Sequence, residues 1–205
     1  MADRHLALLL AVFVMVPVMV GLERLRAPAP DESPSQKRSA CGSDAGEWAR
    51  ELDLRRTQEL TICLLNEHRA RHALVPLTSE PRLEIAAQRY TKDMVKRRFF
   101  AHEDLNGLDP QDRILMAGYP ALHLSTGENL AWGTGVESSP VEIVDGWMHS
   151  PGHRANILEA AFTEVGVGVS AGIPADVEAE RPGATYATSF GGPPVPPGYV
   201  PSERP

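Results

Sequence analysis

The sequence predicts a domain of the α+β class, in which helices cover an antiparallel sheet. Between residues 47 and 149, apolar side chains recur at helical spacing and are interrupted by prolines and glycines. Strand-like patterns come late, with Val-Gly alternation at residues 165–170 and a second candidate at 186–190. This segregation of helical and strand patterns favours helices packed over a sheet built mainly from the second half of the chain.

The first two helices of this scheme have clear boundaries in the sequence. The first covers residues 47–73, with Leu64 on its apolar face, and the second begins at Pro81 with Ser79 or Glu80 as its cap. The second helix should bury five apolar side chains: Leu83, Ala86, Ala87, Tyr90 and Met94. Its opposite face is basic and exposes Lys92, Lys96 and Arg97. The simplest interpretation of that face is a solvated surface.

Two shorter helices follow. The third runs over residues 110–117 and is stopped by Gly118. The fourth begins at Ser139-Pro140, carries Trp147 on its buried face, and is ended by Pro151-Gly152.

The composition excludes several classes of protein. The chain has 205 residues with 20 Lys and Arg against 27 Asp and Glu, a formal net charge of −7. A general nucleic-acid binder needs a basic footprint to neutralise phosphates, so no nucleic-acid partner is expected. Two cysteines are too few for a disulfide-stapled miniprotein or a four-cysteine zinc site. We expect a monomer with one folded domain.

Both ends of the chain differ in composition from the domain. An unbroken apolar run at residues 6–22 predicts a signal peptide or N-terminal membrane anchor over residues 1–26. Residues 27–43 are rich in Pro, Ser, Ala and charge and predict a flexible linker, and residues 192–205 predict a proline-rich disordered tail. The folded domain is therefore expected at residues 44–191. We expect an extracytoplasmic protein, secreted or anchored, that contacts a membrane only through an uncleaved N-terminal segment.

Four local motifs concentrate the residues that could carry chemistry. They are FFAH at 99–102 with NG at 106–107, TGENLAW at 126–132, VEIVDGW at 141–147, and SPGHRANIL at 150–158. Taken singly, each has an ordinary structural interpretation: a loop histidine, a capped turn in which Asn129 fixes the backbone, a helix-surface glutamate, and a helix-terminating turn.

Taken together and in this order, the motifs resemble the CAP superfamily of cysteine-rich secretory, antigen 5 and pathogenesis-related 1 proteins. The likeness is to its secreted bacterial, SCP-like branch and spans about residues 61–191, including the opening helix LLNEHR at 64–69. The resemblance implies an α-β-α sandwich with a central antiparallel sheet and a cleft on one side. The cysteine-rich C-terminal domain of animal members is missing, so their ion-channel-blocking role is not carried over. The usual tryptophan of the last strand is absent from residues 186–191.

The resemblance also implies a cleft tetrad of two histidines and two glutamates: His102, Glu128, Glu142 and His153. Imidazole and carboxylate are ligand types for zinc. His102 and His153, with Glu128 or Glu142, are therefore candidate ligands for Zn²⁺ or another divalent cation. The alternative is a polar network that pins the helices to the sheet with no metal in use.

Two classes of function fit these residues. The first is a binding or interaction module whose cleft holds a metal and a small ligand, a lipid, peptide or glycan. The second is a metal-assisted, peptidase-like hydrolase with Glu128 or Glu142 as general base. The sequence has no H-E-x-x-H motif. No serine sits in a G-x-S-x-G nucleophile elbow, because the one match to that spacing, GVSAG at residues 168–172, continues the Val-Gly alternation of a predicted strand. His149 is expected to be exposed, and Ser150 is expected to cap or end a helix. With no firm catalytic residue, the binding module is favoured.

The two cysteines have a structural interpretation. Cys63 lies on the apolar face of the first helix, which makes it a poor catalytic candidate. In an exported chain, a Cys41–Cys63 disulfide would close a loop of about twenty residues and stabilise the fold by about 3 kcal/mol. The alternative is two separate thiols.

Overall fold

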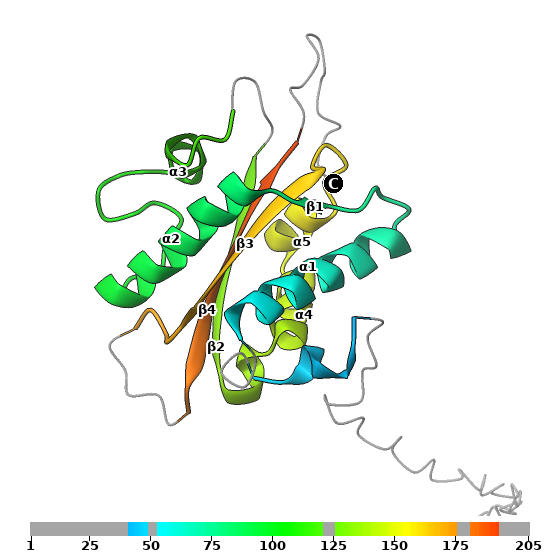
Figure 1. Cartoon of the computed structure of the whole chain (residues 1–205), viewed down its shortest axis with the longest axis horizontal. Helices are drawn as coiled ribbons and strands as arrows, with labels where there is room; N and C mark the ends of the chain where they lie inside the picture. Colours follow the sequence, from blue (N-terminus) through cyan, green and yellow to red (C-terminus); the bar gives the residue numbers. More distant parts are fainter. Residues whose placement is uncertain (1–40, 49–52, 121–125, 176–180, 193–205) are drawn as a thin grey trace, which may run out of the picture. The chain divides into compact units, whose positions relative to one another are not determined.

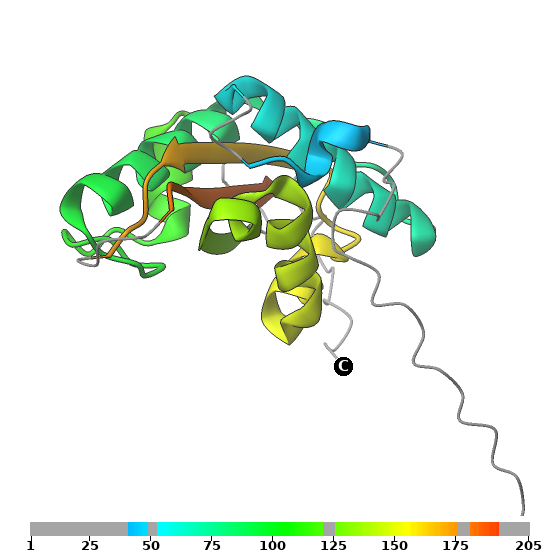
Figure 2. The same cartoon turned by 90° about the horizontal axis from the view of Figure 1, so that it is seen from below.

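The protein folds into three layers, with a four-stranded sheet between helices (Figures 1 and 2). This computed structural model describes residues 41–48, 53–120, 126–175 and 181–192. The strands are β1 (Thr78–Ser79), β2 (Gly127–Thr134), β3 (Glu164–Ala171) and β4 (Gly183–Gly191), in the spatial order β1-β3-β4-β2. The pairings β3–β4 and β2–β4 are antiparallel, and the short β1 pairs in parallel with β3. The predicted α+β sandwich is confirmed.

The Val-Gly alternation of β3 decides which helix covers which face of the sheet. Val165, Val167 and Val169 are buried in the main core, together with side chains of α1 (Leu54–Arg71), α4 (Pro140–His149) and α5 (Pro151–Ile157). Gly166 and Gly168 face α2 (Pro81–Arg97), and a Cβ at either position would come within 2.3 Å of the α2 backbone. The two glycines therefore let α2 lie directly on the sheet.

The helix starts follow the capping signals of the sequence. Glu80 accepts hydrogen bonds from the amides of Arg82 and Leu83, which confirms the predicted start of α2 at Pro81. Asp109 forms a capping box at the start of α3 (Pro110–Met116). Helix α1 begins later than predicted, at Leu54, because Asp53 caps the amide of Arg56. Residues Ser43–Gly46 form a separate 3₁₀ turn, η2.

Two motifs form different elements from those expected. Gly127–Thr134, interpreted as a capped turn around Asn129, is an eight-residue strand at the sheet edge. The helix-terminating turn at Pro151-Gly152 does end α4, but Pro151 is also the first residue of α5. Proline at this position lacks only an amide hydrogen that a helix start leaves unpaired. Ser150, in extended conformation, separates the two helices.

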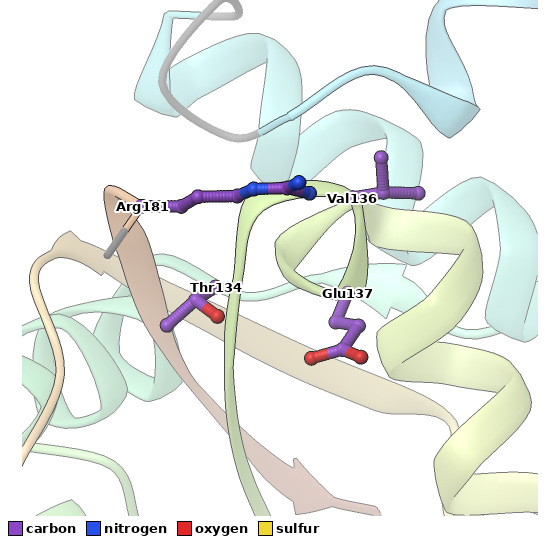
Figure 3. A pocket seen from close by; sticks show the side chains of 4 residues that line it. All are labelled: Thr134, Val136, Glu137 and Arg181. Carbon is purple, nitrogen blue, oxygen red and sulfur yellow. The ribbon is translucent and has the colours of Figure 1, made fainter. Parts of the chain in front are cut away.

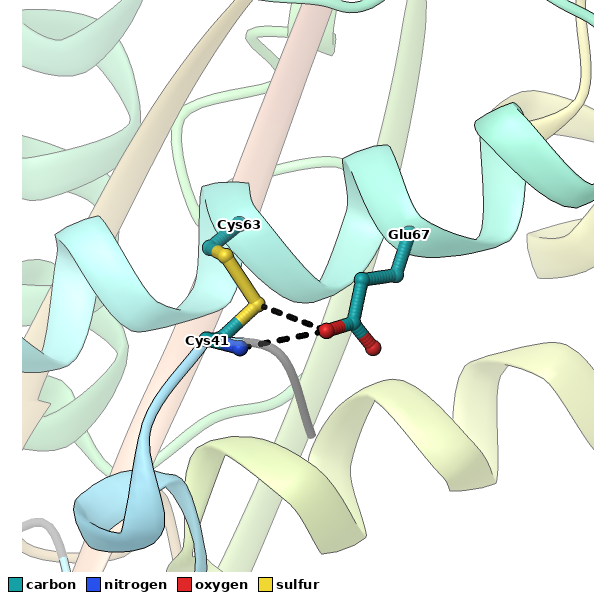
Figure 4. A group of neighbouring side chains, drawn as sticks. All are labelled: Cys41, Cys63 and Glu67. Carbon is teal, nitrogen blue, oxygen red and sulfur yellow. Dashed lines mark hydrogen bonds between the residues drawn. A yellow bond between two sulfur atoms is a disulfide. The ribbon is translucent and has the colours of Figure 1, made fainter. Parts of the chain in front are cut away.

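The disulfide prediction is confirmed. Cys41 and Cys63 are bonded with Cα atoms 5.7 Å apart, which ties the residues before η2 to α1. Glu67, one turn further along α1, accepts a hydrogen bond from the Cys41 amide at 3.1 Å (Figure 4). In the η2 turn that follows Cys41, Ala45 is buried in the main core.

The expected N-terminal apolar segment, the linker up to residue 40 and the tail beyond residue 192 lie outside the described residues. Among the residues that are described, no helix combines the length and apolar character needed to cross a membrane.

Candidate functional site

The centre of the candidate site is a hydrogen-bonded pair formed by His102 and Glu128. His102 lies in the loop after α2, where the Tyr90 hydroxyl of α2 donates a hydrogen bond to the neighbouring carbonyl of Ala101. Glu128 extends from β2, and its Oε1 lies 2.8 Å from His102 Nδ1. The imidazole is exposed over 57% of its side-chain surface, whereas the Glu128 side chain is only 2% exposed. A buried carboxylate therefore holds an accessible imidazole ring in place.

Arg113 neutralises this buried carboxylate. Its Nη2 lies 2.7 Å from Glu128 Oε2, and its Nη1 donates to the Leu108 carbonyl at 2.8 Å. The guanidinium also stacks over the Tyr90 ring, 3.4 Å from the ring centroid. Sequence reasoning missed Arg113 because nothing in its short helix distinguishes it from a solvated arginine. Both Glu128 oxygens are thus engaged, one by His102 and one by Arg113.

A second set of hydrogen bonds fixes His153 through the backbone that carries it. Asn129, fully buried on β2, donates from Nδ2 to the His153 carbonyl at 3.1 Å. Asn156 of α5 donates to the Glu128 carbonyl at 3.1 Å and to Asn129 Oδ1 at 2.9 Å. These amides tie α5 to β2, the outermost strand of the sheet on that side. Asn129 therefore positions α5 and does not fix a turn.

Glu142 lies in the first turn of α4, where its amide donates to Ser139 Oγ at 3.4 Å. Helix α4 packs against β2 and α5, so the residue belongs to the same side of the sheet as His153. Within the described part of the chain, the half-buried Glu142 carboxylate has no hydrogen bond or ion pair. The structure thus joins His102 to Glu128 directly, and the convergence of all four side chains stays a prediction. His149 is exposed over 78% of its side chain, as expected.

The two histidines have opposite pKa shifts. The hydrogen bond that His102 donates to Glu128 raises the pKa of His102. Burial lowers the pKa of His153, and the charge of His102 lowers it further. His102 is therefore the ring of the pair that gains a proton first as the pH falls.

Comparison with known proteins identifies the family. The sequence profile of the cysteine-rich secretory protein family, CAP, matches residues 63–173, more than half of the chain. The chain belongs to the CAP family. The matched segment includes all four residues of the predicted tetrad.

Several bacterial proteins are similar to this chain. The uncharacterized protein YkwD of Bacillus subtilis is 33% identical over 111 residues, which are 54% of this chain and 41% of that protein. The chain thus matches less than half the length of this relative. An extracellular protein containing a SCP domain from Bacillus anthracis matches with a TM-score of 0.54 and 24% identity over 69% of this chain and 44% of that one. An outer surface protein of Borrelia burgdorferi gives a TM-score of 0.54 and 20% identity over 69% of this chain and 96% of that one. These structures establish the CAP fold.

Imidazole and carboxylate are ligand types for a divalent cation, but no three side chains of the tetrad bring their ligand atoms within 4.8 Å of one another in the described structure. With Nδ1 of His102 engaged by Glu128, the other ring nitrogen, Nε2, is the atom available for a metal. A carboxylate that orients the histidine from behind is the usual second partner of a metal-bound imidazole. Glu128 fits that supporting position better than a ligand position, because Arg113 holds its other oxygen. His102 and His153, with Glu142, therefore stay candidate ligands, and their side chains would have to move closer together to share one cation.

Two other features of the described residues lie outside this site. Cys41, Cys63 and Glu67 form the only group of three metal-type side chains in the described ranges whose ligand atoms all lie within 4.8 Å of one another. Their two sulfurs are bonded to each other, so this group offers no thiolates. A pocket of about 370 Å³ at the far end of β2 is lined by Thr134, Val136, Glu137 and Arg181 (Figure 3). It shares no residue with the tetrad.

Proposed function

We propose that this CAP domain is an extracytoplasmic binding module. In this proposal His102 and His153 hold a divalent cation, with Zn²⁺ the first candidate, and a small ligand such as a lipid, peptide or glycan binds beside it. The observation that carries the proposal is the Arg113–Glu128–His102 chain of contacts, with distances of 2.7 and 2.8 Å. This chain orients an exposed imidazole and leaves Nε2 available.

The same contacts support a binding module over a hydrolase. A general base needs a carboxylate that is able to accept a proton, but Glu128 is buried and already accepts hydrogen bonds from two groups. Glu142 is the remaining carboxylate of the tetrad, so a hydrolase would depend on it. No nucleophile paired with a base accompanies it in the motifs.

An extracytoplasmic location is supported by three observations. The apolar run at residues 6–22 has the character of an export signal or anchor. The Cys41–Cys63 disulfide is of a kind that persists in oxidising compartments. The similar protein of Bacillus anthracis is described as extracellular.

Calorimetric titration of the purified full-length protein with ZnCl₂ near pH 7 tests the proposal. We expect one site, with affinity at least tenfold weaker in both His102→Ala and His153→Ala. His149→Ala is the matched control, because it removes an exposed imidazole on α4, and it should leave the affinity unchanged. Equal affinity in all four proteins would contradict the metal site.

A peptidase screen of the zinc-loaded protein separates the two classes of function. A binding module should show no turnover of a peptide library. Zinc-dependent turnover that is lost in Glu142→Gln would overturn the module in favour of the hydrolase.

A further inference from the structure

The outer face of α2 carries a stripe of basic residues. Cations and one apolar side chain follow one another at alternating steps of three and four residues, which places them on one line along the helix. The members of this basic stripe are Arg82, Ile85, Arg89, Lys92 and Lys96. All five are exposed. On a chain with a net charge of −7, four cations along one helix face are a local reversal of charge.

Three of these cations have no acidic partner among the described residues. Arg82 lies 3.8 Å from a Glu80 oxygen, but Arg89, Lys92 and Lys96 have neither an ion pair nor a hydrogen bond there. The nearby Asp93 is occupied, because its Oδ2 lies 3.2 Å from Arg97 Nη1. The stripe therefore presents charge that the described part of the protein does not neutralise.

A groove runs beside the stripe. A cavity of about 260 Å³ lies between α2, residues 104–108 and α3, and both Arg89 and Arg97 line it. Its apolar lining comes from Ala86, Leu108 and Met116, and two carboxylates, Asp93 and Asp104, line it as well. Asp93 is paired with Arg97, and Asp104 accepts hydrogen bonds from the backbone amides at 106 and 108. An anionic head group at Arg89 would therefore have apolar surface within the same groove.

Large apolar side chains surround this groove and stripe. Met116 is 70% exposed and lines the groove, and its neighbour Leu115 on α3 is 47% exposed. Ile85, within the stripe itself, is 41% exposed. Exposed apolar side chains next to unpaired cations are the combination that binds the interface of an anionic bilayer, where head groups meet the cations and acyl chains meet the apolar residues.

We infer that the α2–α3 face docks on a membrane surface containing anionic lipids, with a phosphate head group in the groove at Arg89. This inference goes beyond the proposed function and does not depend on the metal site. A water-soluble polyanion would also meet the cations, but it would gain nothing from Ile85, Leu115 and Met116. The apolar residues therefore favour the lipid surface.

Flotation of the purified full-length protein with vesicles tests the inference. One set of vesicles is phosphatidylcholine alone, and the other contains 30% phosphatidylglycerol. Binding to the phosphatidylcholine vesicles measures the contribution of the N-terminal apolar run, which does not need anionic lipid. The measured quantity is therefore the partition coefficient for the anionic vesicles divided by that for the phosphatidylcholine vesicles. We expect this ratio to exceed ten at 0.1 M salt and to fall towards one at 0.5 M.

Substitutions locate the docking face. In the triple variant Arg89→Gln/Lys92→Gln/Lys96→Gln, the ratio of partition coefficients should fall towards one, because each cation removed lowers it about fivefold. A matched triple variant, Arg55→Gln/Arg71→Gln/Arg154→Gln, makes the same change in charge on α1 and α5 and should retain it. Equal loss in both triple variants would show a non-specific charge effect and overturn the inference. Melting temperatures within 3 °C of the wild type would show that both variants are folded.

The apolar residues distinguish a membrane from a soluble polyanion. The variant Ile85→Ser/Met116→Ser should weaken binding to phosphatidylglycerol vesicles at least threefold and leave binding to soluble polyphosphate unchanged. If the serine variant instead binds vesicles as tightly as the wild type, the apolar residues do not contact the bilayer and the inference is overturned. A wild-type ratio near one would also overturn the inference.

Discussion

Replacing Arg113 by methionine should destabilise the domain by about 3–5 kcal/mol, the usual cost of removing one partner of a buried ion pair. The Glu128 side chain is 2% exposed and that of Arg113 is 10% exposed, so water cannot replace the lost guanidinium. Methionine retains much of the packing on Tyr90, which makes the change mainly electrostatic. The loss of the hydrogen bond to the Leu108 carbonyl adds about 1 kcal/mol.

The second half of this experiment removes the negative charge of Glu128, which Arg113→Met leaves without its ion-pair partner. Glu128→Gln in the Arg113→Met background should recover about 1–3 kcal/mol, because the unpaired buried carboxylate is then absent. Urea unfolding at pH 7 of the wild type, both single variants and the double variant measures this coupling. Arg97→Met is the control, since its partly exposed pair with Asp93 should be worth less than about 1 kcal/mol. A cost below about 1 kcal/mol for Arg113→Met, or strict additivity in the double variant, would refute the reasoning.

Three further predictions follow from the same structure. Trp147 is 1% exposed, and its Nε1 donates a hydrogen bond to the Leu130 carbonyl. The Trp147→Ala variant should therefore lose about 3–5 kcal/mol of unfolding free energy, whereas Lys92→Ala, at an exposed position, should lose less than about 0.5 kcal/mol. Equal melting temperatures for the two variants would contradict these positions. Reduction of the Cys41–Cys63 bond should lower the unfolding free energy by about 3 kcal/mol, measured by denaturation with and without reductant, and an unchanged midpoint would be evidence against that contribution. In an NMR titration the pKa of His102 should lie above the ordinary value of 6.5 and that of His153 below it. Because the pKa of His102 is raised in the folded state, protonation of this ring stabilises the fold fully below about pH 6.5, and this stabilisation is lost as the pH rises through the folded-state pKa. Glu128→Gln should abolish the upward shift of the His102 pKa. A shift that persists in this variant would count against the contact.

The helix starts and the strand alternation that depend on neighbouring residues could be predicted from the sequence. The cap at Glu80, proline in the first turn of α2 and the Val-Gly alternation of β3 each depend on residues close in the chain, and the structure confirms them. The disulfide was inferred from the pairing available in an exported chain. The order of the motifs indicated the family, and with it the α-β-α layers.

Features set by tertiary pairing were not predictable. The segment GENLAWGT contains only one β-branched residue, and it forms β2 because it pairs with β4 along its whole length. Helix α5 has seven residues, too few for a clear periodic pattern. Arg113 and Asn156 gain their roles from contacts with Glu128 and β2, which are 15 and 28 residues away in the sequence. Residue type and local spacing do not encode such contacts.

The central proposal, that Glu128 orients His102 and leaves its Nε2 available for a cation shared with His153, is tested most directly by long-range ¹H–¹⁵N NMR of the imidazole rings. We predict that His102 carries its proton on Nδ1 at pH 8. One equivalent of Zn²⁺ should then shift His102 Nε2 and one nitrogen of His153 together, and leave the exposed His149 unchanged. A proton on Nε2 of His102, or zinc-induced shifts confined to other histidines, would contradict the account.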